Sequence, residues 1–390
     1  MTTSPPATEV GRDLARSRLA AAAAYATQGF VFISITTRLP DVQDHWHLSE
    51  TTLSLLLLVF VLLAGVGSVV AESRSKHTDS ATILRAGLVG IAVAVPVFAL
   101  APALPVFVAA MAVYGVALGM VDATTNMQGV ALEHRFGRPI LPSFHGSWTL
   151  GGLVGAGVAL AIAGLPLGVT GAVAVVPLAV AGAPFLRRAE VALEQSAGIS
   201  VPWRPIALVG VALVLFYMVD TAVFTWGPQY LDKVFPTPGG LVALAVLPYL
   251  LASGVLRLAG DQLVAAYGAV RVLRVGTLVA VAGLAVTVFA PSWPVAVLGF
   301  TVIGAGVAVI APLSFSAAAQ IAGLGEDDPT LRHARVDAVI ARFNQFNYAG
   351  SLLGAVMTGL AGAGNLRIGF AIPMVLVLGI LPLAKAFAPR

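Results

Sequence analysis

Positive charge is distributed unevenly along this chain, on one of two alternating sets of loops between a series of apolar segments. If the N-terminus lies in the cytoplasm and the chain changes side at each apolar segment, 19 of the 22 basic residues fall on the cytoplasmic side. Arg38, Lys233 and Arg367 fall on the opposite side. Basic residues resist transfer across a membrane, so this bias predicts a polytopic membrane protein with both termini in the cytoplasm.

The composition favours the same class of protein. Hydrophobic residues make up 58% of the chain and charged residues only 10%, whereas a soluble domain carries about 25% charged residues. The net charge of +4 is therefore expected on loops beside anionic lipid and not on a nucleic-acid surface. The sequence has no cysteine, which excludes disulfides and thiolate metal sites.

Twelve apolar segments are long enough to cross the hydrocarbon core as helices. The expected spans are 18–39, 50–71, 83–101, 105–130, 143–164, 170–187, 205–230, 239–257, 272–290, 294–319, 339–362 and 367–387. A polar stretch in the middle of the chain separates six spans from six. We therefore predict an all-α membrane protein with an N-terminal six-helix bundle over 1–186, a cytoplasmic linker over 187–204 and a C-terminal six-helix bundle over 205–390.

The two halves of the chain repeat each other. The fifth and eleventh spans share a glycine motif, read as Gly151-Gly152-Leu153-Val154-Gly155-Ala156 and Gly350-Ser351-Leu352-Leu353-Gly354-Ala355. At a second constant offset, Glu72, Pro105 and Gly115 align with Asp261, Pro294 and Gly304. The first span (Tyr25, Gln28, Phe32) aligns with the seventh (Tyr217, Asp220, Phe224) at an offset of its own. The glycines four residues apart in the fifth and eleventh spans predict that these helices pack closely against a neighbour.

A six-plus-six parallel repeat in a chain of this length resembles the major facilitator superfamily. The loop after the eighth span, Gly260-Asp261-Gln262-Leu263 with Gly268 and Arg271, is similar to the turn that follows helices 2 and 8 in that superfamily; the first-half copy keeps Glu72. The resemblance implies two pseudosymmetric six-helix bundles and a cytoplasmic gate at Glu72, Asp261 and Arg271.

Within the superfamily, the fourth and fifth spans resemble the fucose-permease-like branch of bacterial inner-membrane proteins. The matching run is Asp122-Ala123-Thr124-Thr125-Asn126-Met127-Gln128-Gly129 with Glu133 and Arg138, followed by Ser143-Phe144-His145. The seventh span departs from the branch, because Asp220-Thr221 and Thr225-Trp226 stand where Glu-Gly and Asp-Trp pairs are usual. The resemblance therefore does not carry a substrate over to this chain.

Asp122 lies well inside the fourth span, where a charge costs roughly 2.5–3.5 kcal/mol. Together with Asn126 and Glu133 it recurs at three- and four-residue steps among glycines, which makes one polar stripe on the helix. We expect this stripe to face a central cavity and Asp122 to carry protons, because buried carboxyl groups titrate nearer neutral pH. A structural hydrogen bond to a neighbouring helix and direct solute contact are the alternatives.

Asp220 in the seventh span and His145 near the cytoplasmic end of the fifth are two further candidates for proton coupling. For each of them, a purely structural hydrogen bond is the alternative. Tyr249, Ser253 and Arg257 recur at four-residue steps on the eighth span, and Arg257 is assigned to the cytoplasmic gate. The predicted solute-binding set is Tyr25, Gln28, Asn126, Trp148, Tyr217, Asp220, Trp226, Tyr249, Asn344 and Asn347.

The sequence lacks the motifs of several other functions. It has no glycine loop before Lys-Ser/Thr, no His-Glu-x-x-His and no Gly-x-Ser-x-Gly, so we expect neither an enzyme nor a cofactor or metal site. We predict a proton-coupled secondary active transporter of a small polar, sugar-like solute, working by alternating access. Proton-antiport efflux of a drug or metabolite is the main alternative; a non-transporting sensor and a membrane-embedded enzyme are weaker ones. The expected setting is a bacterial inner membrane, with the protein monomeric and bound to lipid, protons and a small molecule but not to nucleic acid.

Overall fold

The computed structural model describes residues 7–75, 77–136, 140–186, 203–235, 237–325 and 345–388, together with positions 328, 332, 335, 336, 339 and 343. Across these residues the regular secondary structure is entirely helical. The chain divides into two compact units, Met1–Val42 with Val59–Glu190 and Gln43–Leu58 with Val191–Arg390. The second unit thus takes in residues 43–58, which the predicted domains had placed with the first half. Most of the predicted linker lies outside the described residues.

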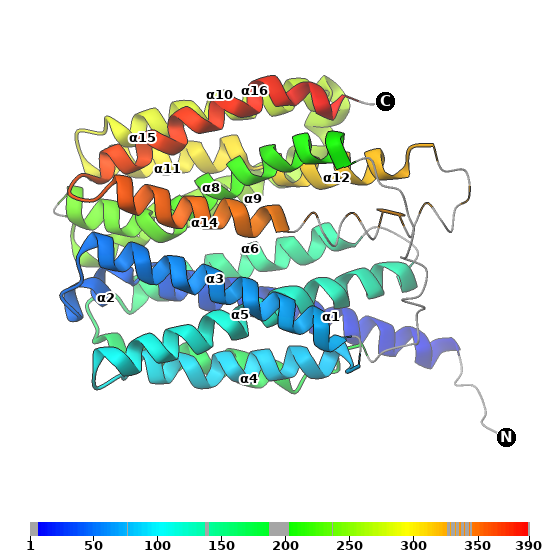
Figure 1. Ribbon diagram of the computed structural model, residues 1–390, viewed down its shortest axis with the longest axis horizontal. Helices are drawn as coiled ribbons and strands as arrows, with labels where there is room; N and C mark the ends of the chain where they lie inside the picture. Colours follow the sequence, from blue (N-terminus) through cyan, green and yellow to red (C-terminus); the bar gives the residue numbers. More distant parts are fainter. Residues whose placement is uncertain are drawn as a thin grey trace. The chain divides into compact units, whose positions relative to one another are not determined.

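The first unit is built from pairs of helices that pack along each other. α1 packs along α6, and α4 packs along α5 (Figure 1). Its elements are α1 (Ala7–Thr36), α4 (Ser80–Ala99), α5 (Leu104–Phe136), α6 (Leu141–Ala161), η1 (Leu167–Ala174) and α7 (Val175–Ala181). Two helices, α2 (Leu39–His45) and α3 (Glu50–Ser75), contain residues of both units.

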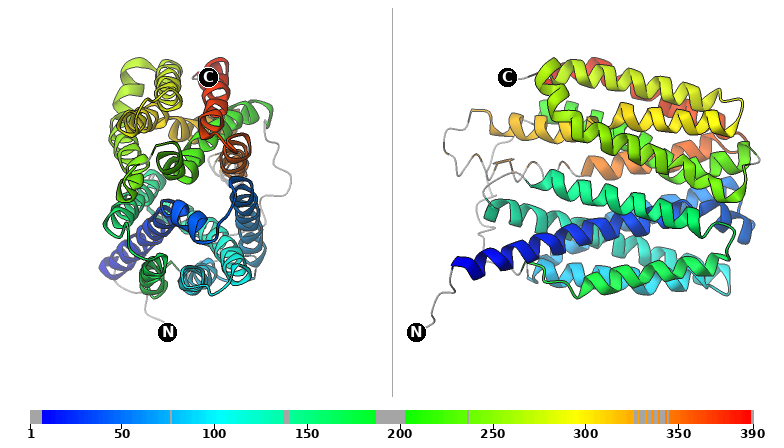
Figure 2. Two further views of the ribbon diagram at one scale, coloured as in Figure 1. Left: turned by 90° about the vertical axis from the view of Figure 1, so that its left-hand side faces the viewer. Right: turned by 180° about the vertical axis from the view of Figure 1, so that it is seen from behind.

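The second unit repeats the pairing. α8 packs along α14, and α10 packs along α11 and α15 (Figure 2). Its elements are α8 (Trp203–Val234), η3 (Gly239–Ala245), α9 (Leu247–Tyr267), α10 (Ala269–Val288), α11 (Trp293–Val307), α12 (Ile310–Gly323), α14 (Gln345–Ala361), α15 (Leu366–Leu376), η4 (Val377–Gly379), α16 (Ile380–Leu383) and η5 (Ala384–Phe387). α11 and α12 together occupy the tenth predicted span, which is interrupted between them.

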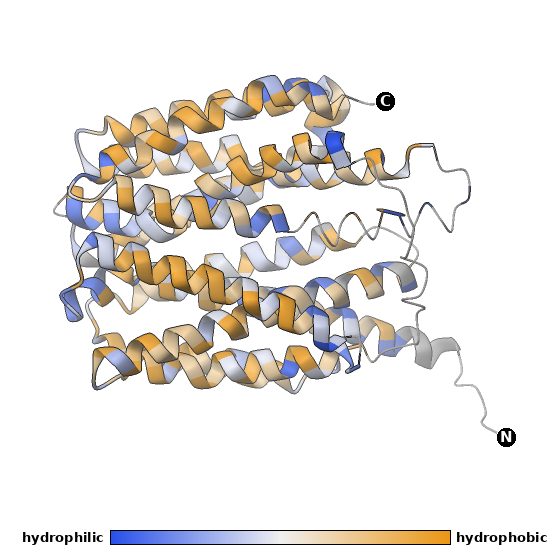
Figure 3. Cartoon of the chain, viewed as in Figure 1, coloured by the Kyte–Doolittle hydropathy of each residue, from blue (hydrophilic) through white to orange (hydrophobic). Residues whose placement is uncertain are grey.

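Apolar residues cover the helices along most of their length (Figure 3). Among the described residues, nine helices are long and apolar enough to cross a membrane; α6, η1 with α7, and α14 lie at the other three predicted spans. An apolar stripe on α3 is between 43% and 60% exposed at steps of three and four residues: Leu55, Val59, Leu62, Val66 and Val69. Such a stripe is unfavourable in water, so it marks a surface that contacts lipid.

Glycines bring α1 and α6 into close contact, as the sequence predicts. A Cβ atom on Gly151 would overlap the backbone carbonyl oxygen of Ala26, and one on Gly155 would overlap that of Phe30. Neither carbonyl belongs to a flexible side chain that can move aside. The two glycines therefore set how closely these helices approach.

The matching contact in the second unit shows that the predicted repeat alignment is wrong by one turn in the seventh span. A Cβ atom on Gly354 of α14 would overlap the carbonyl oxygen of Met218 on α8. Its counterpart in α6 meets Phe30, so Met218 is equivalent to Phe30. The sequence alignment pairs Gln28 with Asp220, which is four residues away from this equivalence. These two side chains therefore do not occupy equivalent depths.

The three basic residues predicted to lie opposite the others are each held by acceptors of their own unit. Buried Arg38 donates from Nη2 to the carbonyl oxygen of Leu165 at 2.7 Å and from Nη1 to that of Ile162 at 3.4 Å, just beyond α6. Its Nε pairs with Asp41 at 2.6 Å. The last carbonyl groups of a helix have no partner within the helix, and a cation can satisfy them.

The same arrangement recurs in the second unit. Arg367 donates from Nη1 to the carbonyl oxygen of Val288, the last residue of α10, at 2.7 Å. Lys233 pairs through Nζ with Asp44 at 2.6 Å and with Asp232 at 2.9 Å. All three positive charges thus face carbonyl or carboxylate oxygens.

Candidate functional site

Four of the predicted site residues meet between α1 and α5 in the first unit. Gln28 donates from Nε2 to Asp122 Oδ1 at 3.0 Å, and the Tyr25 hydroxyl donates to Asn126 Oδ1 at 2.9 Å. Asn126 in turn donates from Nδ2 to the backbone carbonyl of Asp122 at 2.9 Å. We call these four residues the α1–α5 cluster. Tyr25 and Gln28 lie three residues apart on α1, and Asp122 and Asn126 lie four residues apart on α5. The two members on each helix therefore share one face of it.

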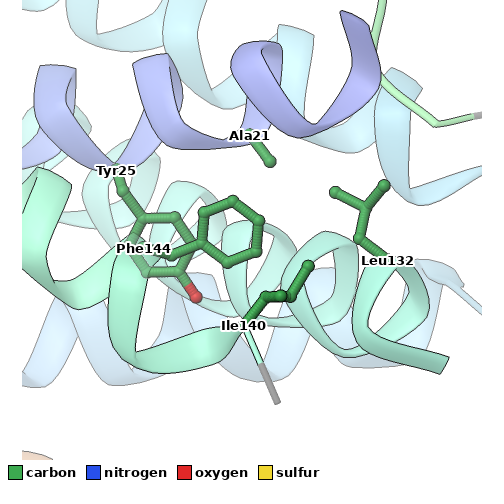
Figure 4. Packing of buried hydrophobic residues seen from close by; sticks show 5 residues of the cluster. All are labelled: Ala21, Tyr25, Leu132, Ile140 and Phe144. Atoms are coloured by element: carbon green, nitrogen blue, oxygen red, sulfur yellow. The ribbon is translucent and has the colours of Figure 1, made fainter. Parts of the chain in front are cut away.

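Packing against α6 fixes the tyrosine of this cluster. The rings of Tyr25 and Phe144 stack with centroids 5.5 Å apart and planes 3° apart, and the His145 ring meets Tyr25 edge-on at 5.5 Å. Figure 4 shows Tyr25 and Phe144 packed with Ala21, Leu132 and Ile140. These apolar contacts hold the hydroxyl group of Tyr25 towards Asn126, so the polar cluster has a defined geometry.

The side chains of the first-unit site differ in their accessibility. Tyr25 and Gln28 are buried, whereas Asp122 and Asn126 are partly exposed. Trp148 of α6 is also partly exposed, and His145 is exposed. Asp122 therefore combines a hydrogen bond to a buried amide with a partly accessible carboxyl group.

In the second unit, Asp220 pairs with Tyr249. The hydroxyl group of Tyr249 on α9 donates to Asp220 Oδ1 on α8, and the exposed fractions of the two residues are 1% and 8%. Phe224, one turn after Asp220, packs edge-on against the Tyr249 ring with centroids 5.5 Å apart. Tyr217, one turn before, is partly exposed and lies beside Gly350 of α14.

A second polar chain in this unit joins α8 to α14. Thr221 Oγ1 donates to Ser351 Oγ at 3.1 Å, and Ser351 Oγ donates to Asn347 Oδ1 at 3.1 Å. The sequence predicted Asn347 but missed the other two residues. Ser351 follows the first glycine of the α14 motif, so its place on the packed face of that helix could have indicated it.

Other predicted residues lie apart from these clusters or outside the described part. Trp226 is fully buried and donates from Nε1 to the carbonyl oxygen of Ala355 at 2.7 Å, which braces α8 against α14. Asn344 lies outside the described residues. The assignment of both to solute binding stays a prediction.

The structure describes the side chains of two of the three predicted gate residues. Glu72 is exposed near the end of α3. Arg271 is exposed at the start of α10, with its guanidinium carbon 5.7 Å from the centroid of the Tyr267 ring. Asp261 lies in α9, and its side chain is not among those described. The gate therefore stays a prediction.

The fourth span also holds the end of the sixth span, a contact that sequence reasoning missed. Gln128 is buried on α5, donates from Nε2 to the carbonyl oxygen of Leu186 at 2.9 Å and accepts from the Leu186 N–H at 2.9 Å. Arg85 and Ser17 donate to the carbonyl oxygens of the first two residues of the segment 183–186, at 3.1 and 3.0 Å. We call 183–186 the exit segment, because it leads out of the sixth span towards the second half.

Glu133, which the sequence placed on one stripe with Asp122, caps a helix. Its Oε2 atom accepts the N–H groups of Ile140 and Leu141 at 2.7 and 2.9 Å, at the start of α6. The first N–H groups of a helix lack acceptors within the helix, and a carboxylate there also complements the helix dipole. The sequence motif on the fourth span therefore contains two kinds of residue. Asp122 and Asn126 belong to the α1–α5 cluster, whereas Gln128 and Glu133 hold the exit segment and the start of α6.

Comparison with known proteins places the chain in a family. Residues 19–355 match the family model described as Major Facilitator Superfamily. The chain belongs to this superfamily. An uncharacterised transporter of Sinorhizobium fredii, y4wD, is 27% identical to this superfamily member over 305 residues, 76% of this chain and 81% of that protein. An uncharacterised MFS-type transporter of Yersinia pestis is 26% identical over 360 residues, 89% of each chain.

Solved structures share the fold of this superfamily member. A mutant form of the nucleoside transporter NupG superposes with a TM-score of 0.70 at 12% identity, covering 96% of this chain and 98% of that one. FucP in its outward conformation gives a TM-score of 0.61 at 16% identity, covering 95% and 98%. The chain is therefore a multi-pass membrane protein with the major facilitator fold, in a family of transporters and not of enzymes.

Proposed function

We propose that this superfamily member is a secondary active transporter, which moves a small polar organic solute by alternating access and draws energy from a proton gradient. The setting would be a bacterial inner membrane, with a monomeric protein and both termini in the cytoplasm. The distribution of basic residues supports this orientation.

The observation that carries the proposal is the hydrogen bond from Gln28 to the partly exposed carboxyl group of Asp122. An ionised carboxylate accepts this bond, and a protonated one accepts it less well. Proton uptake at Asp122 therefore weakens a contact between α1 and α5. The Tyr25–Asn126 bond joins the same two helices one turn away, so proton uptake and the solute-binding residues are mechanically linked.

The chemistry of the site supports a polar solute. The α1–α5 cluster offers amide and hydroxyl groups beside the aromatic rings of Tyr25 and Trp148, a combination that suits a sugar-like molecule. NupG is described as a nucleoside transporter and FucP as a fucose:proton symporter, and both names refer to hydroxyl-rich solutes. These proteins share only the fold with this chain, so they support the solute class without identifying the solute.

A transport assay with Asp122→Asn tests the proposal. A thermal-shift screen of the purified protein against sugars, including fucose, and nucleosides would first provide a ligand. Asparagine has nearly the shape of aspartate but takes up no proton near neutral pH. We expect Asp122→Asn to keep counterflow of that ligand in proteoliposomes and to abolish its accumulation driven by a pH gradient.

Asp13→Asn is the matched control, because Asp13 is an exposed acid on α1. It should leave both counterflow and driven accumulation unchanged. If Asp122→Asn still concentrates the ligand against its gradient, Asp122 does not carry the coupling proton.

A further inference from the structure

Residues 43–58 belong to the first half of the sequence but pack as part of the second unit. They comprise the end of α2 and the start of α3. At the offset that aligns the second and eighth spans, they correspond to residues 232–247, which stay within their own unit. The exchange is therefore one-sided, and the repeated fold does not require it. We call 43–58 the exchanged segment.

Two polar contacts fasten the exchanged segment to the second half of the chain. Asp44 Oδ1 accepts from the Nζ atom of Lys233, near the end of α8, at 2.6 Å. The Oε2 atom of Glu50 accepts the N–H group of Gly364, in the turn between α14 and α15. The two contacts involve different helices of the second half, so they fix both the end of α2 and the start of α3.

Water can replace both contacts when the segment leaves. Asp44 and Gly364 are exposed, and Lys233 keeps a second carboxylate partner in Asp232, at 2.9 Å. Breaking the contact with Asp44 therefore leaves no buried charge without a partner. Ion pairs this exposed contribute little to stability, which suits a contact that opens and closes.

A glycine fits the segment against α8 and α14. A Cβ atom on Gly359 of α14 would overlap both Ser54 Oγ of the exchanged segment and the Trp226 ring of α8. Ser54 and Trp226 are fully buried. The lack of a side chain at Gly359 therefore lets α3 and α8 meet on α14.

Two amide side chains in this region are buried without all of their partners. Gln229 on α8 is 0% exposed, and neither its Nε2 nor its Oε1 atom has a hydrogen-bond partner among the described residues. Gln43 of the exchanged segment is also buried, and its Oε1 atom lacks a partner in the same part of the chain. Buried polar atoms are nearly always paired, because an unpaired one is unfavourable. Docking of the segment therefore keeps three amide atoms away from water at a cost.

The position of Gln229 on α8 places it against the exchanged segment. Trp226 lies three residues before it and Lys233 four residues after it, so the three share one face of the helix. Trp226 adjoins Ser54 at α14, and Lys233 pairs with Asp44. Gln229 thus lies between two points at which this face of α8 adjoins the segment.

We propose that the exchanged segment is a lid, which lifts from the second unit and gives water and solute access to Gln229. This inference rests on the proposed transport function and specifies how its outer side opens. Lifting replaces the contacts of Asp44 and Glu50 by water, and it gives the amides of Gln43 and Gln229 hydrogen-bond partners. These gains offset part of the packing that is lost, so the docked lid is only marginally favoured.

Thiol labelling of the full-length protein in lipid nanodiscs tests the lid, because the sequence has no cysteine of its own. Gln229→Cys places one thiol at the covered position. In an otherwise wild-type chain it should react slowly with a water-soluble maleimide, because it is accessible only while the lid is lifted. Asp44→Asn together with Glu50→Gln should speed this reaction roughly tenfold or more, as the loss of charge-assisted hydrogen bonds predicts.

Ser54→Leu tests the lid without changing a charge. Leucine occurs repeatedly in α3, so the helix should still form. A leucine side chain is too large for the space beside Gly359 while the lid is docked. This variant should therefore also speed the labelling of Gln229→Cys.

Two controls make the test specific. Asp41→Asn breaks the ion pair with Arg38, which lies outside the exchanged segment, and should leave the labelling of Gln229→Cys unchanged. Ser314→Cys places a thiol at a buried position of α12, and the lid variants should leave its labelling slow.

Fast labelling of Gln229→Cys in the otherwise wild-type chain would overturn the inference, because the position would then not be covered. Unchanged labelling in either lid variant would also overturn it. The same holds for an equal acceleration at Ser314→Cys, which would indicate general unfolding.

Labelling requires no solute, which separates the lid from the proposed function. If Asp122→Asn abolishes gradient-driven accumulation but the lid variants do not change labelling, proton coupling stands and the lid fails. If the lid variants accelerate labelling but Asp122→Asn still concentrates the solute, the lid stands and proton coupling at Asp122 fails.

Discussion

Gln128→Ala is expected to release the exit segment from the fourth span. In the wild type, the side-chain amide of Gln128 pairs with both the N–H and the carbonyl group of Leu186, and its Nε2 also donates to Ser80 Oγ at 2.9 Å. Alanine leaves both backbone groups of Leu186 without these partners. The change removes no charge and no residue of the α1–α5 cluster, so its effect reports on the contacts that Gln128 makes with Leu186 and Ser80.

The size of the effect follows from the burial of the two partners. A buried group that loses its hydrogen-bond partner destabilises the folded state by about 1–3 kcal/mol. Leu186 is only partly buried, so water can replace part of each bond. We therefore take the lower limit, about 1 kcal/mol, for each of the two backbone groups of Leu186. Together they lower the free energy needed to open the exit segment by about 2 kcal/mol. Since each 1.4 kcal/mol is a factor of ten, the Leu186 amide should exchange roughly 30-fold faster.

Hydrogen–deuterium exchange of the full-length protein, read by mass spectrometry on peptides that contain residues 183–186, measures this rate. Gln320→Ala is the matched control, because Gln320 is an exposed glutamine of α12 whose loss should not change exchange there. Unchanged exchange of the Leu186 amide in Gln128→Ala would refute the reasoning, because it would mean that the side chain does not hold the segment in the membrane.

Two further predictions concern packing and orientation. Gly304→Ala should destabilise the protein by about 1–3 kcal/mol, because its Cβ would overlap the backbone carbonyl of Tyr249. Gly65→Ala is the control, because its Cβ meets open space and the variant should be neutral. Equal thermal unfolding temperatures of the two variants would contradict the glycine contacts. A cysteine at His77 should be protected from an impermeant thiol reagent in intact cells and one at His47 should be labelled, and the reverse pattern would overturn the orientation.

The sequence was informative about faces of helices and less so about register along them. Asp122 and Asn126 were predicted on one stripe, and both belong to the α1–α5 cluster. A shift of four residues keeps a side chain on nearly the same face of a helix, because a turn contains about 3.6 residues. Apolar periodicity therefore could not show that the alignment of Gln28 with Asp220 is displaced by one helical turn. The contact of Gly354 with the backbone of Met218 shows this displacement.

The sequence also could not predict hydrogen-bond partners that are backbone groups. The acceptor of Gln128 is the carbonyl of Leu186, and any residue at that position would supply it. Trp226 illustrates the related difficulty for side chains, because an indole inside a span is equally suited to a solute or to a neighbouring carbonyl. The carbonyl of Ala355 is its partner in this structure. Both contacts depend on how helices distant in sequence come together.

The arrangement of Arg38, Lys233 and Arg367 bears on how the topology becomes permanent. In the proposed orientation, these three side chains cross the membrane before the helices pack, when the acceptors distant in sequence, such as Asp44 for Lys233 and the carbonyls of Leu165 and Val288 for the two arginines, have not yet assembled. Their transfer is therefore opposed during insertion and is stabilised only later, by oxygens such as the carbonyls of Leu165 and Val288. Once those bonds exist, moving the charges back requires unfolding the helix ends first. Tertiary packing thus opposes the return of these charges across the membrane in the proposed orientation.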